Sequence, residues 1–128
     1  SWGSLLALAG LRGHFADARG LRTVLDRELA IREFSDLAIP LHVLGAEVAS
    51  GEGVVLSRGA LADAILASTA IPGVFPPVAI DGRMLVDGAV ALDSPIAVAI
   101  RLGATRLVVA PCGFPCAGAV LPGHALGR

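Results

Sequence analysis

The chain has 128 residues, of which 55% are hydrophobic, with ten basic and eleven acidic side chains. This length allows one domain with a single hydrophobic core. The near-neutral charge provides no basic stripe for a phosphate backbone, so we expect no nucleic-acid partner. A membrane-spanning helix is not expected either, because prolines interrupt the apolar stretches at residues 60–80 and 107–123.

The first part of the chain predicts one helix and one hairpin. Apolar residues at spacings of three and four indicate an amphipathic helix over residues 20–29. The aliphatic stretch at residues 41–49 is typical of a strand. Turn-forming residues at 50–53 separate it from a second strand over residues 54–56, which completes the hairpin.

A second helix and a second hairpin are predicted in the middle of the chain. Ser57 can cap a helix that continues to Ser68 and that Pro72 and Gly73 bring to an end. An extended segment follows over residues 74–80. The pair Asp81-Gly82 favours a tight two-residue turn, after which residues 83–86 return as a strand.

The last predicted unit is a strand–helix–strand crossover. Asp93 or Ser94 can cap a helix over residues 95–102, with Pro95 in its first turn and Gly103 just past its end. Residues 106–111 are almost wholly aliphatic, as in strands buried within a parallel sheet. Such crossovers are characteristic of α/β proteins, so we expect the α/β class with a mostly parallel central sheet.

Asp87 is the leading candidate for a catalytic group. It follows the apolar residues 84–86 and precedes Gly88, and the working groups of open α/β sheets gather beyond the carboxyl ends of the strands. The apolar flank is expected to make the carboxylate a better proton acceptor. Asp-Gly is also an ordinary turn pair, as at Asp81-Gly82, so a purely structural role stays open.

The other candidates have a weaker chemical basis. Asp93 fits a helix cap better than a catalyst, and lone histidines, here at positions 14, 42 and 124, are more often packed or surface residues. Cys112 and Cys116 have a spacing that fits neither a redox motif nor a zinc framework, so we expect no metal and no cofactor. The sequence contains no Gly-x-Ser-x-Gly elbow and no glycine-rich phosphate loop.

Two stretches of the chain resemble a known family. The sequences "ASTAIPGVFPPV" at residues 67–78 and "IDGRMLVDGAVALDSPIAVAIRLGATRLVV" at residues 80–109 resemble the second half of the patatin-like phospholipase domain, in its bacterial branch. Residues 34–68 are similar to that family too. The resemblance implies a three-layer α/β/α fold, of which residues 1–128 are expected to form an incomplete C-terminal portion. The family's oxyanion loop and Gly-x-Ser-x-Gly elbow are then expected to precede this region.

The resemblance also implies a serine lipid acyl hydrolase that works with a Ser–Asp dyad. The Asp-Gly-Gly or Asp-Gly-Ala motif of the family is matched by Asp87-Gly88-Ala89, which makes Asp87 the catalytic carboxylate and places Gly88 and Ala89 beside the substrate. Val74 and Phe75 are candidates for the wall of an acyl-chain channel, and ordinary core packing explains them equally well.

Two functions stay open at this point. The first is a phospholipase or esterase in lipid breakdown, for which this chain supplies the aspartate and a segment outside it supplies the serine. The alternative is a non-catalytic α/β module that binds lipid or protein. The expected partner is a lipid ester substrate, with transient contact at a membrane surface, and the expected location is the cytoplasm. The sequence does not predict an oligomeric state.

Overall fold

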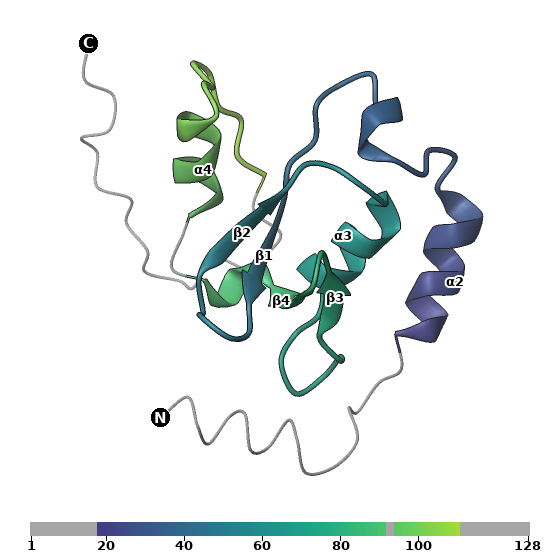
Figure 1. The fold of residues 1–128 in the computed structure, drawn as a ribbon. Helices are drawn as coiled ribbons and strands as arrows, with labels where there is room; N and C mark the ends of the chain where they lie inside the picture. The colour runs from purple at the N-terminus through teal and green to yellow at the C-terminus, as the bar shows by residue number, and fades with distance from the viewer. Residues whose placement is uncertain (1–17, 92–93, 111–128) are drawn as a thin grey trace. The chain divides into compact units, whose positions relative to one another are not determined.

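The computed structural model describes residues 18–91 and 94–110 (Figure 1). The chain divides into two compact units between Pro95 and Ile96. Helix α4 (Pro95–Arg101) begins at this division and belongs almost wholly to the second unit. The elements described in the first unit are, in chain order, α2 (Arg19–Glu28), η1 (Phe34–Asp36), β1 (Val43–Glu47), β2 (Gly53–Leu56), α3 (Leu61–Ser68), β3 (Val78–Ile80), β4 (Arg83–Asp87) and η2 (Gly88–Val90).

The strands of the first unit form one sheet in the order β2-β1-β4-β3. The hairpin of β1 and β2 is confirmed, with Val43 opposite Leu56. The hairpin of β3 and β4 is confirmed as well, with Ile80 opposite Arg83. Strands β1 and β4 join the two hairpins and are also antiparallel. The prediction of a mostly parallel sheet is therefore wrong for the residues that the structure describes.

Tight turns explain why the two hairpins of this sheet are antiparallel. Two strands joined by a short turn must run in opposite directions, whereas a parallel pair needs a crossover of about a dozen residues or more. The predicted crossover ended in a strand at residues 106–111. Residues 107–110 belong to no helix or strand and are exposed, Val108 at 99%. The combination of helices with a sheet is confirmed, and the three-layer arrangement stays a prediction.

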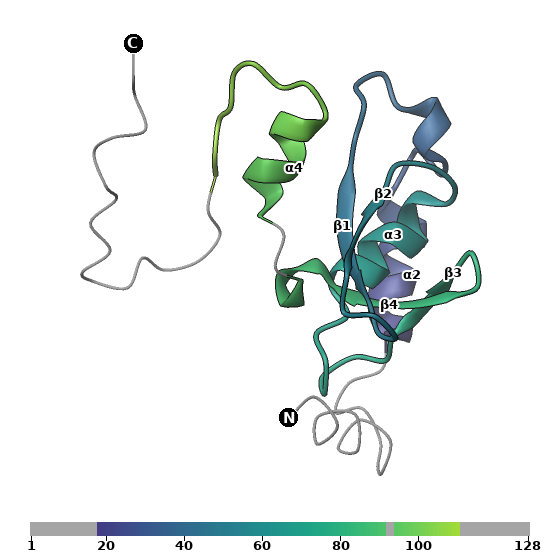
Figure 2. The ribbon, with the colours of Figure 1, turned by 60° about the vertical axis from the view of Figure 1, so that its left-hand side comes forward.

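The core of the first unit lies between α3 and the sheet (Figure 2). Leu85 in β4 is 0% exposed, and it belongs to one cluster with apolar residues of α3, β2 and η1. Removal of these side chains from water is the main force that holds α3 against the sheet. The other buried members of the cluster are Phe34, Val54, Leu56, Leu61, Ala64 and Ala67.

Helix α3 starts later than predicted, and Ser57 does not cap it. The N-cap residue is Ala60, which makes no side-chain hydrogen bond. The start is fixed instead by a backbone contact, since the N–H of Leu61 donates to the carbonyl oxygen of Arg32 at 2.8 Å. The hydroxyl of Ser57 is hydrogen-bonded to Nδ1 of His42 at 2.6 Å. The carbonyl oxygen of Arg32, distant in sequence, therefore takes the place of the cap expected from Ser57.

Helix α2 confirms the predicted amphipathic helix, shifted by one residue. None of its residues is fully buried. It is joined to α3 by an ion pair between Arg22 and Asp63, whose side chains are 42% and 37% exposed. Asp63 of α3 therefore faces α2.

The β3–β4 turn requires its glycine. Asp81 and Gly82 have φ values of 49° and 75°, as in the type I′ turn, whose twist matches that of the flanking strands. We expect Gly82→Ala to lower the free energy of unfolding by about 1 kcal/mol, because alanine is strained at positive φ. Gly20→Ala in α2, where an added Cβ meets nothing within 4 Å, should leave this free energy unchanged or raise it. Urea denaturation distinguishes the two variants, and an equal loss in both would contradict the turn assignment.

Helix α4 begins at Pro95 and ends at Arg101, close to the predicted bounds. Gly103, with φ 97°, follows the helix. Proline at the start and glycine past the end are the expected signals for such a helix. The predicted cap Asp93 lies outside the described residues. Within the described ranges, every helix falls short of the length and apolarity needed to span a bilayer.

Candidate active site

Asp87 is the last residue of β4, one of the two central strands of the sheet. Its backbone lies opposite Gly45 of β1, and its N–H donates to the carbonyl oxygen of Ala70 at 3.0 Å. The residue is partly buried. Asp87 therefore stands at a strand end, as predicted, and neighbouring segments fix its backbone on two sides.

The carboxylate of Asp87 is held by the backbone that follows it. Its Oδ1 accepts a hydrogen bond from the N–H of Ala89 at 2.8 Å, which caps the short helix η2. This bond orients the side chain. Leu85 and Val86 are buried, but the carboxylate itself meets a polar group. The apolar setting expected from the sequence is thus only partly present.

Gly88 permits a close approach between η2 and β1. A Cβ built on Gly88 would lie 2.6 Å from the carbonyl oxygen of Leu44 and 2.9 Å from its Cβ. Side chains do not pack at such distances, so any residue other than glycine would push η2 away from β1. Gly88 thus helps to set the position of the neighbouring Asp87.

The segment after α3 approaches Asp87 at Ala70, two residues past the end of the helix. Ala70 is 0% exposed and accepts the hydrogen bond from the N–H of Asp87. Val74 and Phe75 follow in a turn, where both N–H groups donate to the carbonyl oxygen of Ile71 at 3.0 Å. Val74 is 38% exposed and Phe75 is partly buried. The structure therefore brings Ala70, rather than the two predicted channel residues, into hydrogen-bond contact with Asp87.

The remaining candidates from the sequence lie elsewhere. Asp81 forms the β3–β4 turn, which confirms its predicted structural role. His42 is exposed and pairs with Ser57. The candidates that lie outside the described residues are His14, Asp93, Cys112, Cys116 and His124.

Two contacts that organise the site were not predicted. In the first, the carbonyl oxygen of Leu44 lies against Gly88. In the second, the carbonyl oxygen of Ala70 accepts the hydrogen bond from the N–H of Asp87. A backbone carbonyl has no signature in the sequence, because every residue carries one. The available signal was Gly88, since a glycine beside a functional residue often marks a close backbone approach.

Comparisons with known proteins identify a family and several relatives of this chain. A family model described as patatin-like phospholipase matches residues 1–100 of the 128. Uncharacterized NTE family proteins of Mycobacterium bovis and of two strains of Mycobacterium tuberculosis are each 43% identical over 61 residues. That match covers 48% of this chain and 17% of each relative, so the chain corresponds to a small part of their length. Because the family model matches most of its residues, the chain belongs to the patatin-like phospholipase family.

Proposed function

We propose that this chain supplies the acidic member of a Ser–Asp dyad in a hydrolase that cleaves lipid esters. Membership of the patatin-like phospholipase family supports acyl hydrolysis in general terms. The observation that carries the specific proposal is the position of Asp87. It ends a central strand, is partly buried, and has its carboxylate oriented by Ala89 while Gly88 packs against β1.

The chemistry needs a carboxylate that is oriented yet able to accept a proton. The two oxygens of a carboxylate can together accept about four hydrogen bonds. The bond from Ala89 uses one of these positions. In the proposed step, a serine hydroxyl transfers its proton to Asp87 while the serine oxygen attacks the ester carbonyl carbon.

The products follow from that step. The leaving alcohol takes the proton from Asp87, and an acyl-enzyme remains on the serine. Water then transfers a proton to the same carboxylate and attacks the acyl group, so a fatty acid is released and the serine recovers its proton. Backbone N–H donors outside these residues stabilise the tetrahedral oxyanion in this proposal.

Substrate contacts are proposed for four residues around the aspartate. Gly88 and Ala89 follow Asp87 directly, so in this proposal their backbone and the small side chain of Ala89 lie beside the bound ester. Val74 and Phe75 form an apolar wall for the acyl chain, supported by the hydrogen bond that ties the start of their segment to Asp87. Transient contact with a membrane surface would deliver such a substrate.

The 128-residue chain alone is expected not to hydrolyse p-nitrophenyl esters, because it has an acceptor for a proton but no serine in an elbow. The measurement is release of p-nitrophenolate by the purified chain. Ser57→Ala is the matched control, since the hydroxyl of Ser57 is hydrogen-bonded to Nδ1 of His42 at 2.6 Å. Turnover by the purified chain, whether or not it needs Ser57, would contradict the expectation.

The coding sequence ahead of residue 1 gives the broader test. The proposal requires a Gly-x-Ser-x-Gly elbow there, placed after a strand. A start codon directly before Ser1 would instead leave the non-catalytic binding module as the function.

A further inference from the structure

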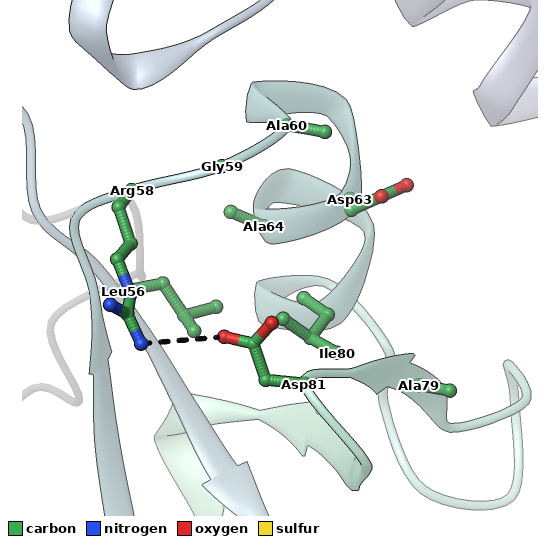
Figure 3. A pocket seen from close by; sticks show the side chains of 9 residues that line it. All are labelled: Leu56, Arg58, Gly59, Ala60, Asp63, Ala64, Ala79, Ile80 and Asp81. Carbon is green, nitrogen blue, oxygen red and sulfur yellow. Dashed lines mark ion pairs between the residues drawn. The ribbon is translucent and has the colours of Figure 1, made fainter.

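A cavity of about 470 Å³ lies at the opposite end of β4 from Asp87. It opens between the start of α3 and the β3–β4 turn (Figure 3). Strand β4 separates Arg83 from Asp87 by four residue steps, which is roughly 13 Å in a strand. The cavity is therefore distinct from the candidate active site.

The inner wall of the cavity is apolar. Leu56 of β2, Ala64 of α3 and Ile80 of β3 line it. Leu56 and Ala64 are 6% and 2% exposed, so they belong to the hydrophobic core as well. A volume of this size falls within the range of small-molecule sites in proteins, which is about 300–1,000 Å³.

Three charged side chains lie around the cavity. Asp63 is already engaged by Arg22 of α2. Arg58 and Asp81 face each other across the opening (Figure 3), with Nη2 of Arg58 3.8 Å from Oδ2 of Asp81. Their side chains are 91% and 64% exposed. Such a long, solvated ion pair contributes little and is readily exchanged for another partner.

The guanidinium group of Arg58 and the apolar wall together suit a ligand that has both a negative charge and an aliphatic tail. A guanidinium group binds a carboxylate with two parallel hydrogen bonds, and aliphatic carbon atoms gain free energy when they leave water. We propose that this cavity binds an aliphatic carboxylate, with its head group on Arg58 and its tail against Leu56, Ala64 and Ile80. A fatty acid released by the proposed hydrolysis belongs to this class, but binding at the cavity does not depend on that activity.

The experiment titrates the isotope-labelled chain with sodium octanoate and follows backbone amide shifts by NMR. The expected shifts centre on Gly59, Ala64 and Ile80. Arg58→Gln should weaken binding about tenfold, because it removes a charge-assisted contact. Asp81→Asn should strengthen binding, because it removes a negative charge that competes for Arg58 and asparagine tolerates the positive φ at this position.

Arg83→Gln is the matched control, since Arg83 is an exposed arginine close in sequence to the turn but absent from the cavity wall. It should bind octanoate as the unmodified chain does. Octanol and acetate test the tail and the head group separately, and both should bind more weakly than octanoate. The proposal is overturned by an absence of shifts at the cavity with millimolar octanoate, by equal weakening in the two arginine variants, or by octanol binding as tightly as octanoate. None of these measurements involves hydrolysis, so they stand apart from the test of the active site.

Discussion

Replacement of Asp87 by asparagine is expected to lower ester hydrolysis by roughly 10²- to 10⁴-fold, the contribution typical of a general base. This result applies to the protein in which the chain is combined with its nucleophilic serine. The amide cannot take the serine proton, although its carbonyl oxygen can still accept the hydrogen bond from Ala89. The fold should therefore persist. Initial rates on a p-nitrophenyl ester, together with the urea midpoint, measure both effects.

Asp81→Asn is the matched control for this variant. Asp81 is also followed by glycine, but it lies in the β3–β4 turn at the far end of β4 from Asp87. We expect its activity to stay close to that of the unmodified protein. Full activity in Asp87→Asn, or an equal loss in both variants, would show that Asp87 is not the proton acceptor.

Gly88→Ala is expected to lower the free energy of unfolding by about 1–3 kcal/mol and to reduce hydrolysis as well. The added Cβ would lie 2.6 Å from the carbonyl oxygen of Leu44, a backbone atom of a central strand that cannot rotate away. The strain must be relieved by movement of η2, which carries the N–H that orients the Asp87 carboxylate. Urea denaturation and initial rates measure the two consequences.

Gly45→Ala provides the comparison for the glycine variant. Gly45 is buried in β1 directly opposite Asp87, yet a Cβ there would lie 3.5 Å from the nearest atom, the carbonyl oxygen of Val86. That distance is an ordinary contact, so this variant should retain most of its stability. If Gly88→Ala were as stable as Gly45→Ala, the close approach of η2 to β1 would have no energetic importance.

Local sequence patterns predicted most of the elements in the first unit. The spacing of apolar residues by three and four over residues 20–29 matches helix α2. The turn residues at 50–53 and 81–82 lie where the two hairpins reverse direction. These features depend on neighbours in sequence: the spacing of apolar side chains, and glycine at positive φ. The chain direction within each hairpin follows directly from them.

Long-range contacts account for the features that sequence patterns did not predict. The pairing of β1 with β4 joins segments about forty residues apart, and no local signal sets its direction. The start of α3 depends in the same way on the distant carbonyl oxygen of Arg32 rather than on the neighbouring Ser57. The expected parallel sheet and the expected cap were wrong because each was inferred from residues nearby in sequence.

The candidate site was predicted in part. The position of Asp87 at a strand end follows from the apolar residues 84–86 that precede it. The hydrogen bonds from Ala89 and to Ala70 involve backbone atoms, which sequence patterns cannot locate. The roles of Val74 and Phe75 stay predictions, since their contact with an acyl chain depends on a bound substrate.

The most direct test of the central claim is the rate at which a fluorophosphonate labels the nucleophilic serine in the protein that contains both groups. Labelling requires the serine to lose its proton, so its rate reports on the proton acceptor without involving product release. We expect labelling of a serine in a Gly-x-Ser-x-Gly elbow, identified by mass spectrometry, and a large decrease in its rate in Asp87→Asn but not in Asp81→Asn. An unchanged labelling rate in Asp87→Asn would contradict the assignment of Asp87 as the base.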